Sequence, residues 1–241
     1  MSTAKGGGKI IDDGLIFYID AANPQSYVSG STTWNNLIDT VTTATLIGGS
    51  TFNSSNAGSI QFNGTDGYAD LSNTTTLAPP VGSEDWSLNL WFTLDADTGA
   101  TQYVMSSINT GNSDWWYVQA TYSSNNIAFR ADDGSNPLVE LNSTAATLTN
   151  WTNVCVTRDK SANEFRLYVN GAHQETDTAG DTTVDSNDEI LIGALWGFGG
   201  ANVTPKRGFT NGRVSCVSIY NKALSATEVS QNYNVLKSRF K

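Results

Sequence analysis

The residues best suited to breaking a sugar linkage are Glu175 and Asp177, two acids in a Glu-Thr-Asp sequence. Retaining glycosidases need two carboxyl groups about 5 Å apart across the scissile bond. A strand can present them as Glu-x-Asp-x-Glu, because alternate side chains share a face, but Ala179 stands at the third acidic position. The surrounding residues are polar and predict a loop. Glucanase-type hydrolysis therefore has little support in this sequence.

Nucleophilic and zinc chemistry lack the residue types that they need. The single histidine, His173, follows the Asn170-Gly171 turn and is predicted to be an exposed loop residue. No Gly-x-Ser-x-Gly nucleophile elbow occurs. One histidine and two separated cysteines also make a poor set of zinc ligands. We therefore predict that the chain is not an enzyme.

Four aromatic residues could instead hold a ligand. Trp115 and Trp116 are adjacent, so on a strand they point to opposite faces and at most one belongs to a one-sided core. Trp196 and Phe198 flank Gly197 in a glycine-rich loop. Large aromatic side chains more often anchor a core or a subunit interface than a sugar. These four residues are therefore candidates for a glycan site, with core or interface packing as the competing interpretation.

Alternating side chains predict the strands that must position these residues. Residues 151–171 alternate on both sides of the polar turn 159–163, which predicts an antiparallel hairpin with one face in a core. Residues 85–95 alternate most regularly, with Trp86 through Leu94 facing inward at every second position. Further strands are predicted at residues 12–20, 102–107, 115–122, 127–131, 189–196 and 213–220. Ser225 and Glu228 form a capping box for a helix over 226–237.

Composition limits the class of protein. The 241 residues carry 23 acidic and 13 basic side chains, a formal charge of −10 that disfavours nucleic acid and anionic membranes. No apolar run reaches membrane-spanning length. Residues 1–9 predict a flexible arm without the apolar core of a signal peptide, and residues 10–241 predict one all-β domain. Without a secretory signal, Cys155 and Cys216 are expected to be buried, reduced thiols.

Three segments in a fixed order resemble a known family. The hairpin at 151–171, the earlier residues 58–71 and the closing residues 212–234 resemble parts of laminin-G-like, concanavalin A-like jelly-roll domains. The resemblance covers residues 10–237 and implies an antiparallel jelly-roll sandwich with one short C-terminal helix. In such a fold the strands that carry Cys155 and Cys216 could be neighbours, so a disulfide between them stays open.

Domains of this type often hold Ca²⁺ with Asp carboxylates. Residues 63–68, Asn-Gly-Thr-Asp-Gly-Tyr, resemble the family's Asp-Gly-x-Asp-Asp-Tyr turn and keep Asp66 as a ligand candidate. Asp95 and Asp97 begin an EF-hand-like sequence that lacks the later ligands. Asp185, Asp188 and Glu189 form another acidic group. Turn formation and solvated charge are the competing explanation for all three, so a calcium site remains an alternative.

The opening residues narrow the resemblance. Residues 14–27, Gly-Leu-Ile-Phe-Tyr-Ile-Asp-Ala-Ala-Asn-Pro-Gln-Ser-Tyr, and Trp34-Asn-Asn-Leu37 are similar to the start of laminin-G-like domains in structural proteins of tailed bacteriophages. This implies a non-enzymatic virion protein, as decoration, tail or baseplate component, located in the particle with other virion proteins as partners. A homo-oligomer is expected. The alternative is a lectin-like module that recognises host-surface glycans, with or without Ca²⁺.

Overall fold

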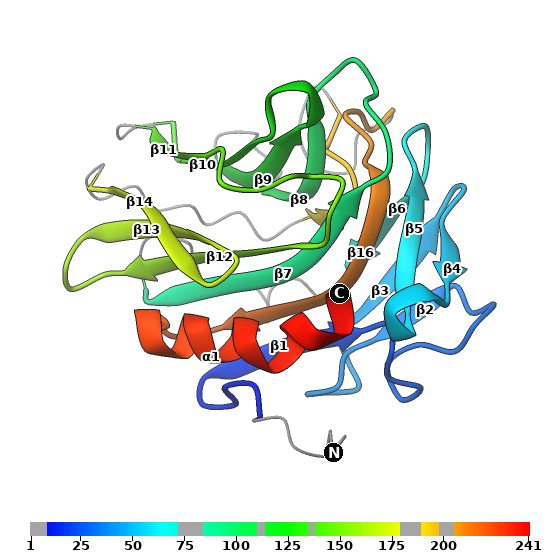
Figure 1. Ribbon diagram of the computed structural model, residues 1–241, viewed down its shortest axis with the longest axis horizontal. Helices are drawn as coiled ribbons and strands as arrows, with labels where there is room; N and C mark the ends of the chain where they lie inside the picture. The colour runs from blue at the N-terminus through cyan, green and yellow to red at the C-terminus, as the bar shows by residue number, and fades with distance from the viewer. Residues whose placement is uncertain (1–8, 72–83, 110–113, 135–137, 179–188, 198–204) are drawn as a thin grey trace.

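The computed structural model describes residues 9–71, 84–109, 114–134, 138–178, 189–197 and 205–241. Over this part of the chain the strands form two antiparallel sheets that pack face to face (Figure 1). We call them the β7 sheet and the β9 sheet, after a strand inside each. The predicted all-β antiparallel sandwich is confirmed.

Each sheet contains eight strands within the described residues. The β7 sheet contains β1 (Leu15–Asp20), β4 (Thr51–Asn53), β5 (Ser59–Asn63), β7 (Trp86–Leu94), β12 (Thr152–Asp159), β13 (Glu164–Val169), β14 (Ala172–Asp177) and β16 (Asn211–Tyr220). The β9 sheet contains β2 (Thr33–Asn35), β3 (Thr43–Ile47), β6 (Tyr68–Leu71), β8 (Gln102–Ile108), β9 (Trp115–Thr121), β10 (Asn126–Asp132), β11 (Val139–Ser143) and β15 (Glu189–Ile192).

The strand order mixes local hairpins with long-range pairings. The β7 sheet runs β14-β13-β12-β7-β16-β5-β4, with β1 also paired to β16, and the β9 sheet runs β11-β10-β9-β8-β15-β6-β3-β2. Strands β14 and β11 are therefore edge strands, and they lie on the same side of the molecule (Figure 1).

The predicted central hairpin is confirmed as β12 and β13. Val154 pairs with Val169 and Val156 with Leu167, and all four side chains are at most 2% exposed. The next turn has φ values of 52° at Asn170 and 76° at Gly171, as a two-residue turn with positive φ requires.

Strand β7 is buried on both faces, which its alternation alone does not predict. The apolar residues at every second position from Trp86 to Leu94 face the core between the sheets, as expected. The opposite face is buried too, because the C-terminal segment covers it: the ring of Trp91 stacks on Phe240 at a centroid distance of 4.3 Å and on Tyr233 at 5.6 Å.

Helix α1 (Ala226–Leu236) confirms the predicted helix to within one residue. Ser225 Oγ accepts from the Glu228 N–H, and a Glu228 carboxylate oxygen accepts from the Ser225 N–H, so the capping box is complete. The helix lies along the outer face of the β7 sheet (Figure 1). A Cβ on Gly171 would lie 2.9 Å from the Tyr233 ring, so this glycine also allows the helix to approach.

Cys155 and Cys216 are free, buried thiols, as expected. Strand β7 lies between their strands, because Cys155 faces Asn89 and Cys216 faces Trp91 on its two sides. The alternative of a disulfide is therefore wrong. Burial raises the pKa of both thiols, which disfavours the thiolate form that reacts.

Two kinds of element differ from the prediction. Strand β14, which carries His173, Glu175 and Asp177, replaces a predicted loop. Strands β2, β3, β4 and β11 are three to five residues long and are not predicted by the sequence pattern. Within the described residues, no helix is both long and apolar enough to cross a membrane.

Candidate binding site

Strand β9 places aromatic side chains on both faces of its sheet. Trp116 points into the sandwich, where it is 3% exposed and packs on Trp86 at a centroid distance of 5.5 Å. Trp115 and Tyr117 point away from the core and are half-buried. The adjacent tryptophans therefore do lie on opposite faces. Trp116, a candidate ligand-binding residue in the sequence, is therefore a core residue, because its indole is enclosed between the sheets.

A hollow of about 270 Å³ lies on the outer face of the β9 sheet. Its lining residues are Tyr103, Trp115, Tyr117, Leu195, Trp196 and Arg207. The rings of Trp115 and Tyr117 are stacked at 5.1 Å and 6°, and Tyr103 meets Tyr117 edge-on at 5.1 Å. The Trp196 ring lies 6.1 Å from that of Trp115. We call this feature the aromatic hollow; its volume is near the lower end of ligand sites.

Two short segments, residues 193–197 and 205–210, fold over the β9 sheet and close one side of the hollow. We call them together the strap. Leu195 and Arg207 join the segments by two backbone hydrogen bonds of 2.9 and 3.1 Å. Lys206 forms an ion pair with Glu189 on β15 in which both side chains are 4% exposed. The strap thus holds Trp196 and Arg207 against the aromatic residues of β8 and β9.

Gly208 lets the strap lie close to the sheet. Its φ is 57°, and a Cβ at this position would lie 2.3 Å from the Tyr103 ring. The Tyr103 N–H donates to the Gly208 carbonyl at 2.9 Å, and the Thr210 hydroxyl donates to the Tyr103 carbonyl at 2.9 Å. The position of the Tyr103 ring therefore depends on a residue without a side chain.

The aromatic hollow combines apolar ring faces with hydrogen-bond donors. Arg207 lines it, and Arg130 on β10 lies beside Tyr117 and donates to Glu140 at 2.5 Å. Burial raises the pKa of Tyr103 and of Tyr117, and the nearby arginines oppose that rise only in part. Both phenol groups are therefore protonated at neutral pH and can donate. None of the lining residues that the structure describes is acidic.

Two of the residues that line this site are predicted from the sequence. Trp115 and Trp196, far apart in the sequence, are brought together as candidates of one site, while Phe198 lies outside the described residues. Tyr103, Tyr117 and Arg207 are missed. Tyr117 could have been found from its two-residue spacing to Trp115 on a strand, whereas Tyr103 and Arg207 depend on the β8–β9 register and on the strap.

The carboxylate of Asp66, the candidate calcium ligand, accepts hydrogen bonds that hold its own turn in place. Asn63 Oδ1 accepts from the N–H groups of Thr65, Asp66 and Gly67. Asp66 Oδ1 accepts from Asn63 Nδ2 at 2.7 Å and from the Gly49 N–H at 3.1 Å, and these bonds lower the pKa of Asp66. Among the described residues, no group of three or more His, Cys, Asp or Glu side chains could hold a metal ion.

Other acids proposed from the sequence are also engaged in the fold. Asp95 pairs with Arg213 at 2.9 Å, and Asp97 accepts from the Gly99 N–H. Asp185 and Asp188 lie outside the described residues. Glu189 is the buried partner of Lys206.

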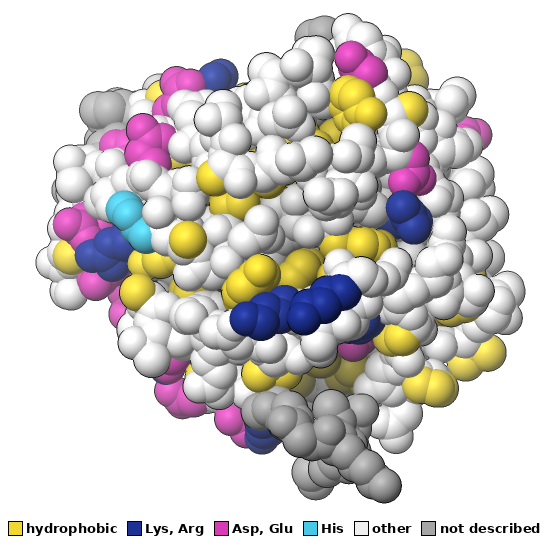
Figure 2. Space-filling model, viewed as in Figure 1, with side chains coloured by type: hydrophobic (Ala, Val, Ile, Leu, Met, Phe, Trp, Pro, Cys, Tyr) yellow, Lys and Arg dark blue, Asp and Glu magenta, His cyan; other side chains and the backbone are white. Residues whose placement is uncertain are grey.

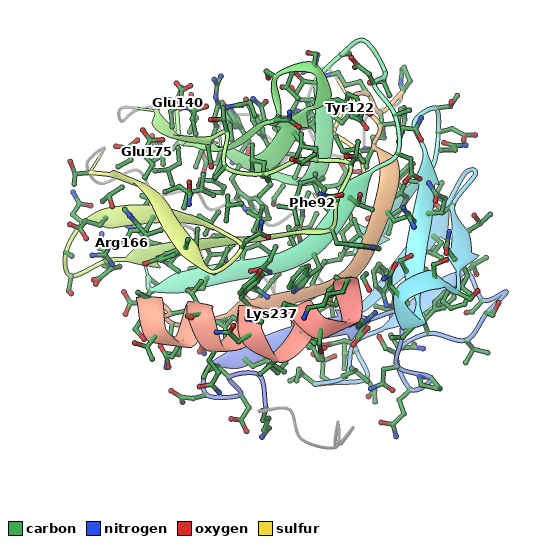
Figure 3. All side chains as sticks on the ribbon, in the orientation of Figure 1. Phe92, Tyr122, Glu140, Arg166, Glu175 and Lys237 are labelled. Atoms are coloured by element: carbon green, nitrogen blue, oxygen red, sulfur yellow. The ribbon has the colours of Figure 1, made fainter. Side chains whose placement is uncertain are left out.

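The sugar-cleaving candidates Glu175 and Asp177 lie on edge strand β14 and reach across to the other sheet. Glu175 Oε2 accepts from the Asn142 N–H, and Asp177 Oδ2 accepts from the Glu140 N–H at 2.8 Å. Figure 3 labels Glu175 and Glu140 at this edge, on facing strands. Both carboxylates thus satisfy backbone donors of β11.

His173 is an exposed residue of β14 and not of a loop, which corrects its predicted setting. Its Nε2 lies 2.8 Å from the Thr176 hydroxyl, and its ring meets Tyr168 edge-on at 5.4 Å. The imidazole is visible at the surface in Figure 2, close to basic and acidic side chains.

A second pair of acids lies under the strap. Burial first, and then the Glu189 carboxylate, raise the pKa of Asp70 on β6 from 3.8 to about 6, with Lys206 opposing the rise. Glu189 is covered by Lys206 and almost inaccessible. The two acids are therefore poorly placed to act on a sugar from opposite sides.

The chain belongs to the concanavalin A-like lectin/glucanase superfamily. A laminin-G-type model of that superfamily matches residues 63–230, more than half of the chain. The fold implied by the resembling segments is thereby confirmed. No curated protein matches the chain in sequence.

Solved structures of low sequence identity share this fold. The receptor-binding domain of botulinum neurotoxin type G is 16% identical with a TM-score of 0.64, over 92% of this chain and 51% of that one. The binding domain of botulinum neurotoxin DC, solved with rat synaptotagmin II, is 15% identical with a TM-score of 0.70, over 92% and 52%. Trypanosoma rangeli sialidase, solved with sialic acid, is 16% identical with a TM-score of 0.65, over 99% and 36%. This chain thus spans about half of those binding domains and about a third of the sialidase.

Proposed function

We propose that this chain is a non-catalytic binding module that holds a carbohydrate in the aromatic hollow. The observation that carries the proposal is the set of four aromatic rings on the outer face of the β9 sheet, joined by Arg207 and the two tyrosine hydroxyls. The superfamily contains lectins as well as glucanases, and the shared fold alone does not choose between them.

The shape and chemistry of the hollow suit a single sugar ring. A sugar presents an apolar face of C–H groups, which packs on an aromatic ring, and a rim of hydroxyls, which needs donors and acceptors. Trp115 offers a half-buried indole face, and Tyr103 and Tyr117 offer hydroxyl groups. The hollow is too small for an extended polymer to be enclosed, so a terminal or single residue is the expected ligand.

Binding of a glycan panel to the wild-type chain and to Trp115→Ala tests the proposal. We expect the variant to lose binding by up to about tenfold, since a stacked ring contributes about 0.5–1.5 kcal/mol beyond the area that it buries. Trp151→Ala is the matched control, because Trp151 is also half-buried but lies with Phe240 on the other sheet. Absence of any sugar binding, or equal loss in both variants, contradicts the proposal.

The absence of catalysis is part of the proposal. Glu175 and Asp177 are committed to backbone donors of β11, and Glu189 is committed to Lys206. We expect no release of reducing ends from β-glucans or other oligosaccharides incubated with the chain. Hydrolysis that disappears in Glu175→Gln or Asp70→Asn would overturn this assignment.

We propose further that the module is carried on a bacteriophage particle, where it meets host-surface glycans beside other virion proteins. The support is the similarity of residues 14–27 and 34–37 to the opening of phage laminin-G-like domains. Mass spectrometry of purified particles tests this: a stoichiometric amount of the chain in the virion is expected. If the chain is absent from particles but still binds sugar, the proposed location on a virion is wrong and the proposed binding function stands.

A further inference from the structure

A second hollow lies on the outer face of the β7 sheet, beside the start of α1. Its volume is about 540 Å³, twice that of the aromatic hollow and within the range of ligand sites. We call it the helix-side hollow. Its lining comes from β12, β13, β14 and the turn before α1, and it includes Asp159, Arg166, Tyr168, His173, Thr176 and Leu224.

The pleat of β13 directs two polar side chains into this hollow. Every second residue of the strand, beginning at Phe165, faces the core between the sheets. Arg166 and Tyr168 therefore point outward, and Figure 3 labels Arg166 on this strand. On the neighbouring strand β14, Thr176 pairs with Arg166 and His173 pairs with Tyr168. Backbone pairing thus gathers the polar groups of the hollow.

The Tyr168 side chain is buried, but its hydroxyl opens into the helix-side hollow. The residue is only 3% exposed, and it packs with Leu224 and with Val229 of α1. Its hydroxyl has no hydrogen-bond partner among the described residues, and it is not one of their fully enclosed atoms. A buried polar group is costly unless it is hydrogen-bonded. The hydroxyl is therefore available to a ligand that reaches the floor of the hollow.

The helix-side hollow offers both donors and acceptors. The Ala162 N–H and other donors of the same turn hold the pKa of Asp159 below its usual value, so its carboxylate accepts at neutral pH. Burial raises the pKa of Tyr168, with Arg166 opposing the rise in part, so its hydroxyl donates. Arg166 forms an ion pair with Glu164, which takes one of the five N–H donors of a guanidinium. These charges balance, and the site has no net preference for an ion.

We infer that the helix-side hollow is a second sugar site, for a neutral ligand. It goes beyond the proposed function, because it does not use the aromatic hollow. Each hydroxyl of a sugar both donates and accepts, so one ring can meet Asp159, Arg166 and Tyr168 together. Leu224 supplies an apolar wall for the C–H groups of the ring. An ion would lose its hydration here without gaining an opposite net charge.

The two hollows lie on opposite sides of the molecule. The β7 sheet and the β9 sheet pack face to face, so their outer faces point away from each other (Figure 1). Sugars bound in the two hollows leave the chain in opposite directions. A single chain can therefore link two glycans, and such linkage raises avidity without any new contact.

Amide NMR spectra of the wild-type chain, titrated with methyl glycosides of glucose, galactose, mannose and N-acetylglucosamine, test the inference. We expect at least one glycoside to shift the amides of Tyr168, His173 and Ala226 saturably, apart from any shifts at Trp115 and Tyr117. This binding should not change as NaCl is raised, because neither the ligand nor the lining carries a net charge. Acetate and methylammonium are the charged probes. Tighter binding of either ion than of every glycoside overturns the neutral assignment.

Tyr168→Phe removes the hydroxyl alone. We expect it to weaken binding at the helix-side hollow by about threefold to tenfold, the effect of one hydrogen bond, and to leave the aromatic hollow unchanged. Tyr68→Phe is the matched control, because Tyr68 is also a strand residue but lies half-buried on β6 of the other sheet, and it should change neither site. Trp115→Ala should leave binding at the helix-side hollow intact.

Failure of this inference and failure of the proposed function give different results. Shifts confined to the aromatic hollow, or binding that Tyr168→Phe leaves unchanged, overturn the inference while the proposed function stands. Shifts confined to the helix-side hollow contradict the proposed function and support the inference, and shifts at neither hollow overturn both. Because the titrations use the wild-type chain, the test remains decisive if a variant does not fold.

Discussion

The ionisation of the Asp70 side chain affects the stability of the fold around the strap. It lies on the outer face of β6 and is partly buried, with Glu189 and Lys206 as its charged neighbours. Burial of a carboxylate favours its protonated form, and the Glu189 charge adds to this effect. An acid whose pKa is raised in the folded state stabilises the protein below its unfolded pKa, and this stabilisation is lost as the pH rises through the folded pKa.

Asp70→Asn should therefore stabilise the protein at neutral pH. The folded-state pKa of about 6, against 3.8 for the free group, places the change between about pH 4 and pH 6. We expect a gain of about 1 kcal/mol in the free energy of unfolding at pH 7.5, after allowance for partial solvent exposure, and little change at pH 4. Urea unfolding at both pH values measures the change in the free energy of unfolding. Glu84→Gln, which removes an exposed carboxylate, is the control. An equal effect at both values would show that charge is not its cause.

The residue scale also shows where sequence reasoning stops. The opposite directions of Trp115 and Trp116 follow from the pleat of any strand, so they could be predicted. The identity of the buried one could not, because it depends on which face of β9 meets Trp86 and Phe129. Tyr103 and Arg207 join the site through long-range pairing, which local spacing does not contain.

Strands β11 and β14 show how two sheet edges can be protected by side chains. An edge strand exposes unpaired N–H groups that can recruit another chain. Here Glu175 and Asp177 of β14 accept from the Asn142 and Glu140 N–H groups of β11. Predicted as a polar loop, β14 is a strand because it pairs with β13, and its polar side chains face solvent and the neighbouring edge.

Removing both acids should expose the edge of β11. In Glu175→Ala with Asp177→Ala, we expect amide hydrogen exchange of Glu140 and Asn142 to accelerate by about tenfold or more, because each donor loses its acceptor. Self-association at high concentration should rise as well. A double variant of Glu164 and Asp159, acids of the neighbouring hairpin, is the control. Unchanged exchange at both amides would contradict the role assigned to these carboxylates.

The C-terminal segment is held by one arginine. Arg239 follows α1 and donates to the Asn56 carbonyl at 2.9 Å, to Asp20 Oδ1 at 2.8 Å and to the Gly58 carbonyl at 2.8 Å. Its side chain is 13% exposed. This contact fixes Phe240 over Trp91, while Lys237 lies at the surface of the helix (Figure 3).

Arg239→Ala should destabilise the fold by about 2–4 kcal/mol, since it leaves the buried Asp20 carboxylate without its cation and takes one donor from each of the Asn56 and Gly58 carbonyls. Arg239→Lys should restore part of that loss, because a lysine keeps the charge but not the fork. Chemical denaturation of the three chains measures the effect. Lys237→Ala, which removes an exposed cation from the same segment, should cost less than about 0.5 kcal/mol. A similar small cost for Arg239→Ala would show that the contact does not hold the segment.

At the scale of the whole molecule, each sheet has one face in the common core and an outer face with its own cover. The α1 helix and the C-terminal segment cover the β7 sheet, and the strap covers part of the β9 sheet. The aromatic hollow lies beside the strap, which supplies Leu195, Trp196 and Arg207 to its lining. The architecture was predictable because alternation is repeated in many strands, whereas both covers come from irregular segments whose contacts are set by packing.

At the same scale, we expect the fold of the described region to be independent of calcium. The turn that resembles a calcium loop is closed by hydrogen bonds of the Asn63 and Asp66 side chains, so its conformation is held without a cation. A metal bound only by the folded state raises the melting temperature by mass action. We expect neither excess CaCl₂ nor EDTA to shift the thermal midpoint measured by circular dichroism. A rise with CaCl₂ that Asp66→Asn abolishes would place an ion at this turn, and a rise that survives Asp66→Asn would direct the search to Asp185 and Asp188.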